Sequence, residues 1–203
     1  MPALALGLWS LYGLLSLLLR VAVQARRTGS SGVNLITRES GAAEWAAGIG
    51  FIGALALGVA APILDLADLL DPIDELNTTG PHLAGIVLYA IGLVGVVGSQ
   101  AAMGTAWRIG VDPDEHTALV TGGPFAVVRN PIFTMMSLTV IGLALLVPSA
   151  VSFASVAVLV ITLELQTRVV EEPHLLRTHG EAYASYARRV GRFLPGLGRL
   201  QHP

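Results

Sequence analysis

The chain has 203 residues, of which 53% are hydrophobic and 13% are charged, and its formal net charge is −2. Because a soluble domain carries about 25% charged residues, this composition predicts an integral membrane protein. The near-neutral charge argues against nucleic acid as a partner. The absence of cysteine excludes disulfides, thiolate metal sites and cysteine nucleophiles.

The first apolar segment, residues 3–23, predicts a transmembrane helix rather than a signal peptide. Val23-Gln24-Ala25 resembles a cleavage site, but no basic region precedes the segment, and Arg26-Arg27 follow it. A secretory signal has the opposite order, with its positive charges ahead of the apolar run.

Five apolar runs divide the chain: residues 3–23, 45–64, 83–103, 132–147 and 150–165. A membrane-spanning helix needs about 20 apolar residues, so the first three runs are long enough. The last two are shorter, and only Pro148-Ser149 separates them, which predicts a helical hairpin or, alternatively, a re-entrant pair. We therefore expect an all-α polytopic protein with five transmembrane helices. It forms a single membrane domain, 1–203, made of a three-helix part, 1–103, and a second part, 104–203, that holds a long loop, the hairpin and a C-terminal tail.

Arginine placement predicts the orientation. The segments after the first and third runs and the tail contain arginine, whereas the loop after the second run contains Asp65, Asp68, Asp71, Asp74 and Glu75 and no arginine. Because cytoplasmic loops carry the excess of positive charge, the N-terminus is expected outside and the C-terminus in the cytoplasm. The location predicted is the cell inner (plasma) membrane.

Glycines recur within the second and third apolar runs, at positions 48, 50, 53 and 58 and at 92, 95 and 98. Small residues let helices approach closely in lipid. They predict tight packing within the chain, with homodimerisation as the alternative.

The tail, residues 171–190, has apolar residues at helical spacing and predicts a cytoplasmic amphipathic helix, lying on the membrane or over the bundle. Pro173 suits its first turn. Gly180 lies in its middle and predicts a break there.

Arg129-Asn130-Pro131 stands where the chain re-enters the membrane. Asn is a strong N-cap and Pro favours the first helical position. A helix N-terminus beside a guanidinium can bind an anion, either a lipid phosphate or a ligand carboxylate.

Further charged residues flank the end of the last apolar run. Glu164 and Arg168 are four residues apart and are expected to pair. Glu171 and Glu172 are either helix-start charges or partners for a ligand ammonium or ribose. No metal site is predicted, because His174 and His179 do not share a helix face and the acidic loop is typical of solvated sequence.

Two linked motifs resemble the isoprenylcysteine carboxyl methyltransferase family. The first, residues 116–133, contains His-Thr-Ala-Leu-Val-Thr-Gly-Gly-Pro-Phe and then Arg-Asn-Pro-Ile-Phe. The second contains Glu171-Glu172, a Gly-Glu-Ala-Tyr segment at 180–183, and Arg192-Phe193-Leu194-Pro195. Asn130 and Phe133 stand where the family usually has His and Tyr.

The resemblance implies an integral membrane methyltransferase with S-adenosylmethionine bound on the cytoplasmic side and a lipophilic acceptor, a carboxylate in that family, reaching it from the bilayer. The residues implied around the cofactor are His116, Val120, Gly123, Phe125, Arg129, Asn130, Pro131, Phe133, Glu171 and Glu172. For the reaction we predict that Arg129 binds the methionine carboxylate and Arg168 orients the acceptor. An amine or hydroxyl acceptor would need a base, and Glu164 or His116 could serve.

Three alternatives stay open at this point. The acceptor is another lipid, such as a phospholipid amine or a quinone-type ring; the protein is an NADPH-dependent reductase of the sterol-reductase type; or it is a non-catalytic membrane protein.

Overall fold

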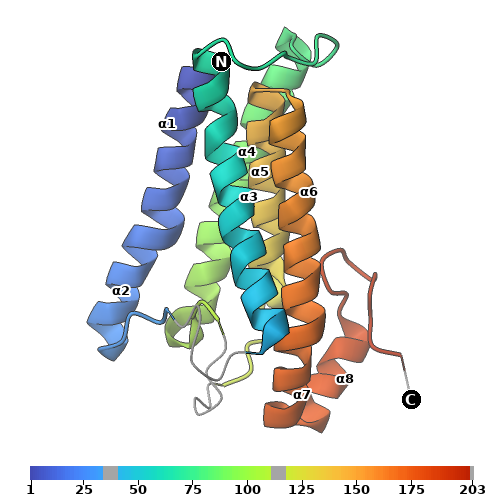
Figure 1. Ribbon diagram of the computed structural model, residues 1–203. Helices are drawn as coiled ribbons and strands as arrows, with labels where there is room; N and C mark the ends of the chain where they lie inside the picture. Colours follow the sequence, from blue (N-terminus) through green and yellow to red (C-terminus); the bar gives the residue numbers. More distant parts are fainter. Residues whose placement is uncertain (34–40, 111–117, 202–203) are drawn as a thin grey trace.

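The computed structural model describes residues 1–33, 41–110 and 118–201, and the regular elements within them are helices. In chain order these are α1 (Pro2–Gly13), η1 (Leu14–Leu18), α2 (Leu19–Thr28), α3 (Ala42–Leu66), α4 (Thr79–Met103), η2 (Gly104–Ala106), η3 (Gly123–Ala126), α5 (Pro131–Leu146), α6 (Ala150–Leu165), η4 (Gln166–Glu171), α7 (Glu172–His179) and α8 (Glu181–Arg189). The long helices stand side by side as a bundle (Figure 1).

Four helical stretches in the described residues are long and apolar enough to cross a membrane: Pro2–Thr28, Ala42–Leu66, Thr79–Ala106 and Ala150–His179. They include the first three predicted spans and the last one. The remaining predicted span, α5, is an apolar helix of only 16 residues. The all-helical membrane fold is therefore confirmed, and the count of five spans stays a prediction.

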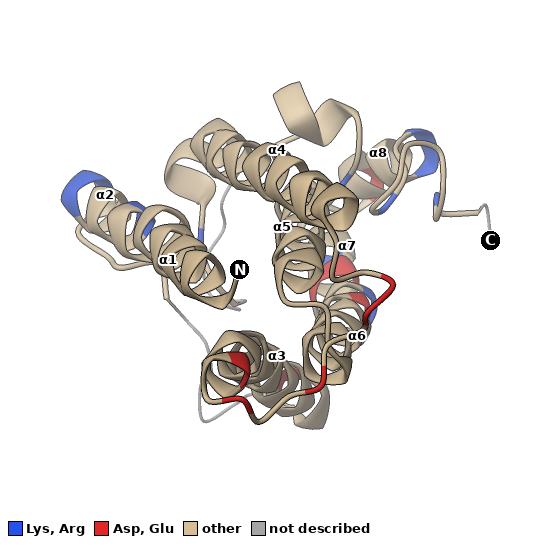
Figure 2. Ribbon diagram, turned by 90° about the horizontal axis from the view of Figure 1, so that it is seen from above, with Lys and Arg blue, Asp and Glu red and all other residues tan. Residues whose placement is uncertain are grey.

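α5 and α6 form the predicted hairpin around Pro148-Ser149. Ser149 caps α6, because its Oγ accepts a hydrogen bond from the backbone N–H of Ser152 at 3.3 Å. The Pro148 carbonyl accepts from Ile73 N at 2.8 Å, which fastens the turn to the acidic loop. α5 runs inside the bundle between α4 and α6 (Figure 2).

Glycines bring α4 and α5 into close contact. A Cβ added to Gly142 would lie 2.6 Å from the Gly85 carbonyl oxygen, and one added to Gly92 would lie 2.3 Å from Thr139 Oγ1. Gly50 and Gly58 likewise meet α6 side chains. The predicted packing role of glycine is thus confirmed at Gly50, Gly58 and Gly92. It is wrong for Gly53 and Gly98, which have open space at the Cβ position. The alternative of homodimerisation stays a prediction.

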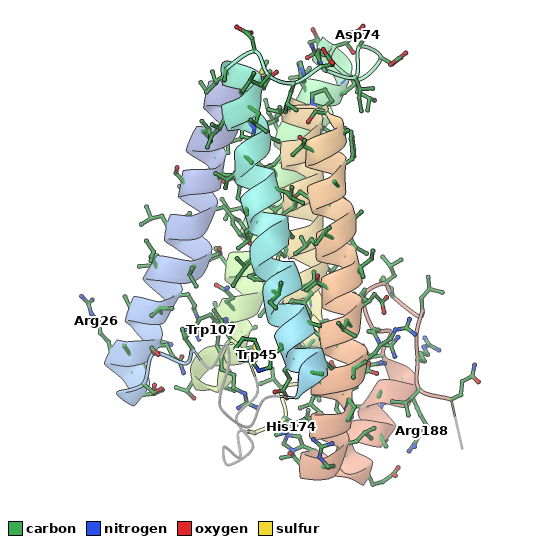
Figure 3. All side chains as sticks on the ribbon, in the orientation of Figure 1. Arg26, Trp45, Asp74, Trp107, His174 and Arg188 are labelled. Carbon is green, nitrogen blue, oxygen red and sulfur yellow. The ribbon has the colours of Figure 1, made fainter. Side chains whose placement is uncertain are left out.

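Charge separates toward the two ends of the bundle. The acidic loop with Asp74 lies at one end, and Arg26 and Arg188 lie toward the other (Figure 3). This separation follows the alternation of arginine-rich and arginine-free connections in the sequence.

The tail, residues 171–190, is two helices rather than one. η4 is a π-helical turn that carries α6 directly into α7. The chain then turns at Gly180, whose φ of +53° favours glycine, and α8 begins. The break predicted at Gly180 is confirmed. Contact of α8 with the membrane surface stays a prediction.

Candidate functional site

The Arg129-Asn130-Pro131 corner is held against the C-terminal segment by backbone hydrogen bonds. Arg129 N donates to the Gly191 carbonyl at 2.8 Å, and Asn130 N donates to the Arg192 carbonyl at 3.0 Å. Gly191 has no room for a side chain, since a Cβ there would lie 2.1 Å from the Leu194 oxygen. Two segments distant in sequence therefore form one wall.

The Arg129 side chain is buried and is bound within the protein. Its Nη1 donates to the carbonyls of Ala187 at 2.9 Å and Val190 at 2.6 Å. Its Nη2 donates to Glu172 Oε1 at 2.5 Å and to the Gly198 carbonyl at 3.1 Å. Nε has no hydrogen-bond partner among the described residues. Most of the guanidinium thus holds the tail in place.

Glu172 joins Arg129 to Arg192. Arg192 Nε donates to Glu172 Oε1 at 2.7 Å, and Arg192 Nη2 donates to Glu172 Oε2 at 2.9 Å. The hydrogen bond with Glu172 raises the pKa of Arg192 above its ordinary value. We call Arg129, Glu172 and Arg192 the clamp. Sequence reasoning missed the position of Arg192 in it, because only folding brings residue 192 next to residue 129.

Asn130 occupies the N-cap position of α5, but its side chain makes no capping hydrogen bond. Its Nδ2 instead donates to the Arg192 carbonyl at 3.4 Å. The predicted N-cap position is therefore confirmed, but the side chain does not cap the helix, because its amide is directed to the C-terminal segment. Pro131 does stand at the first turn of α5, as predicted.

A cavity of about 500 Å³ begins at this wall and extends between the helices. Its polar part includes Arg108, Asn130, Gln166, Glu171 and His174. Its apolar part is bordered by residues from α1, α3 and α5, among them Trp9, Phe51, Leu55, Ile132, Phe133 and Met136. One space therefore joins charged groups to a hydrocarbon-like interior.

The residues implied around the cofactor divide into three groups. Val120, Phe125, Arg129, Asn130, Phe133 and Glu171 line the cavity. Three further residues are not among those that line the cavity. Two of them, Gly123 and Pro131, lie in η3 and at the start of α5, and the third, Glu172, belongs to the clamp. His116 lies outside the described residues.

Glu164 and Arg168 are not among the residues that line the cavity. They form the predicted i,i+4 ion pair, with side chains 38% and 58% exposed. The pairing is confirmed. The cavity geometry lends no support to the catalytic roles predicted for Arg168 and Glu164.

Sequence reasoning also missed the contribution of α1 and α3. Trp9 and Tyr12 of α1 line the cavity with their rings edge to face, 6.2 Å apart. Their i,i+3 spacing was the available signal, since residues three apart share a helix face.

Tyr183 and Tyr186 of α8 also line the cavity. The Tyr186 hydroxyl donates to the Phe125 carbonyl at 2.6 Å, which links α8 to η3. Burial raises the pKa of Tyr186 to about 12, and it raises the pKa of Tyr183 as well. Both phenols are therefore neutral hydrogen-bonding groups at physiological pH.

We expect stability to fall at alkaline pH because of this burial. The folded-state pKa of Tyr186 lies above the unfolded value of about 10, so its contribution is complete below about pH 10 and is lost as the pH rises through about 12. Thermal unfolding in detergent across that range checks this. In Tyr186→Phe the alkaline loss should be smaller, and an identical loss in both proteins would contradict the assignment.

Comparison with known proteins shows which family the chain belongs to. The phospholipid methyltransferase family matches residues 81–182, half of the chain, including most of the cavity's polar wall. The chain belongs to the phospholipid methyltransferase family. Its long apolar helices fit a multi-pass membrane protein of this family.

A solved structure of the eukaryotic intramembrane Ras methyltransferase ICMT (isoprenylcysteine carboxyl methyltransferase) is similar to this chain at a TM-score of 0.57. The two are 19% identical over 92% of this chain and 63% of that one. The similarity shows a shared fold and confirms the predicted resemblance.

Two curated relatives are similar over about half of the chain. The nickel-cobalt-cadmium resistance protein NccN of Alcaligenes xylosoxydans xylosoxydans is 29% identical over 54% of this chain, and the cobalt-zinc-cadmium resistance protein CzcN of Cupriavidus metallidurans is 29% identical over 55%. The chain spans about half the length of these relatives.

Proposed function

We propose that the protein transfers a methyl group from S-adenosylmethionine to a lipophilic acceptor within the cavity. The observation that carries the proposal is the continuity of one cavity from charged residues to an apolar interior between α1, α3 and α5. A polar cofactor and a lipid could therefore meet in one space, as methyl transfer requires. The bound cofactor would supply the methyl group.

The polar end has groups that suit the cofactor. Glu171 is a carboxylate for the amino group or ribose hydroxyls, and it lies within electrostatic reach of Arg108. Arg108 and Arg129 Nε could together bind the methionine carboxylate, while Val120 and Phe125 offer apolar contact to the adenine. In this assignment Glu171, rather than Glu172, contacts the cofactor, because Glu172 is occupied in the clamp.

The protein's task in the reaction is positioning. The cavity walls would align the two reactants and exclude water, which is the main source of acceleration when the acceptor is already a nucleophile. A carboxylate acceptor, implied by the resemblance, fits this description.

An amine-bearing lipid is a second candidate. Glu44, Glu171, His174 and His179 line the cavity, and the two carboxylates among them attract an ammonium and disfavour a further carboxylate. An amine must lose a proton, and Glu171 or His174 is better situated for this than Glu164, which is not among the lining residues.

The two curated relatives have names that refer to metal resistance. In the described part of this chain there is no group of three or more His, Cys, Asp or Glu that could hold a metal ion. The proposal rests on the methyltransferase family instead.

We further propose that the cavity opens to the cytoplasm in the inner membrane. The arginine-rich connections lie at the end of the bundle that holds the polar part of the cavity, and the acidic loop lies at the other (Figure 3). The positive-inside rule orients such a chain with its arginine-rich end in the cytoplasm.

The test is calorimetric titration of the detergent-purified protein with S-adenosylmethionine, S-adenosylhomocysteine and NADPH. We expect the first two to bind. Glu171→Ala should weaken S-adenosylhomocysteine by about 10- to 100-fold, since a charged hydrogen bond contributes about 1.5–3 kcal/mol. Glu164→Ala, an equal loss of charge on the same continuous helix, should bind normally.

Binding of NADPH alone would replace the methyltransferase by the reductase alternative. Transfer of a labelled methyl group to phosphatidylethanolamine, a farnesylated cysteine or a quinol then separates amine, carboxylate and hydroxyl acceptors.

A further inference from the structure

The C-terminal segment, residues 190–200, exposes large apolar side chains. Leu194 and Leu197 are 55% and 62% exposed. The segment rises from α8 beside the lower part of α6 (Figure 1) and lies on the outer side of α8 (Figure 2). These leucines thus stand at the periphery of the bundle, near one end of a helix long enough to span a membrane.

Arginines accompany the two leucines. Arg188 and Arg189 end α8, where they contact Glu181 and Ser185 respectively, and the exposed Arg199 follows in the segment itself. Apolar side chains next to arginines are typical of protein at the boundary between lipid head groups and acyl chains. Anionic lipids attract the cations there.

We infer that residues 190–200 form an interfacial anchor in this protein's own membrane. Leu194 and Leu197 enter the boundary between head groups and acyl chains, and the neighbouring arginines face anionic head groups. The occupant of this surface is the lipid bilayer. Charge complementarity and the position beside the end of α6 favour it.

The anchor is bonded directly to the cavity wall. Arg129 donates to the carbonyls of Val190 and Gly198, and Thr134 Oγ1 donates to the Phe193 carbonyl at 2.8 Å. Arg129 itself lines the cavity. Insertion of the anchor therefore supports the polar wall, so that cofactor affinity depends on the lipid surface. This coupling rests on the proposed function, whereas the anchoring does not.

The chain has no cysteine, so Leu194→Cys and Leu197→Cys each provide a unique site for a nitroxide label. We expect labels at both positions to report the head-group region in nanodiscs of phosphatidylcholine and phosphatidylglycerol. A label on Arg177→Cys, an exposed residue of α7, should report water. If the labels at positions 194 and 197 instead indicate an aqueous environment, the proposal of an interfacial anchor is overturned.

The coupling is tested by S-adenosylhomocysteine affinity in the same nanodiscs. Leu194→Ser/Leu197→Ser should bind about tenfold more weakly, since moving a leucine out of an apolar environment costs at least that order in an equilibrium constant. Leu66→Ser/Leu69→Ser, a matched pair of exposed leucines at the end of α3 and in the acidic loop that follows it, should bind as the wild type does.

The coupling is overturned if the labels report the head-group region but the Leu194→Ser/Leu197→Ser variant binds S-adenosylhomocysteine as tightly as the wild type does. If the wild type fails to bind S-adenosylhomocysteine, the proposed function fails and the coupling with it, and the labels still decide the anchor.

Discussion

Arg129→Ala is expected to lower the free energy of unfolding by about 3–5 kcal/mol, the usual cost of breaking a buried ion pair by removing one partner. In this variant Glu172 still pairs with Arg192 but loses Arg129, the more buried of its two partners. The carbonyls of Ala187, Val190 and Gly198 lose their donor at the same time. Thermal or denaturant unfolding in detergent measures the change.

The matched control is Arg168→Ala, which removes an arginine from an exposed i,i+4 pair with Glu164. It should change stability by less than about 1 kcal/mol. Arg129→Lys should restore little, because an ammonium cannot reproduce the planar fork that reaches a carboxylate and three carbonyls. Equal effects of Arg129→Ala and Arg168→Ala would show that the clamp does not stabilise the fold.

Gly142→Ala is expected to destabilise the protein by about 1–3 kcal/mol through overpacking. The added Cβ would lie 2.6 Å from both the Gly85 oxygen and the Tyr89 nitrogen. These are backbone atoms, so no side-chain rotation relieves the clash, and α4 must move away from α5. The unfolding midpoint of the purified variant checks this.

Gly98→Ala is the control within α4, because nothing lies within 4 Å of its Cβ position. Both substitutions gain the same helix propensity of about 1 kcal/mol, so their difference isolates the clash. Equal stability of the two variants would mean that α4 and α5 are not packed through their glycines.

Hydrophobic run lengths predicted the helices well because a membrane-spanning helix satisfies its own backbone. The α5–α6 hairpin followed from Pro148 and Ser149, and the break between α7 and α8 followed from Gly180. These features are local, because each depends on residues that are adjacent in the sequence. The π-helical turn at Gln166–Glu171, which carries Glu171 to the cavity, had no such local signature.

The sequence predicted which residues lie at the candidate site better than it predicted what each of them does. The resemblance brought Val120, Phe125, Asn130 and Glu171 to the right cavity. We predicted that Arg129 binds a ligand carboxylate, although most of its guanidinium N–H groups donate to Glu172 and the tail carbonyls. A sequence cannot tell a free arginine from a paired one when the partner is 43 positions away.

By itself, the sequence determined the membrane class, the helix positions, the hairpin and the family motifs, because composition, periodicity and capping act over a few residues. Only the tertiary structure decided that Glu172 binds Arg129 and Arg192, that Glu164 and Arg168 are not among the residues lining the cavity, and that α1 and α3 complete it. Those outcomes depend on which helices meet. That is set by the close approach of α4 and α5 at Gly142 and by the return of the C-terminal segment to the Arg129 corner.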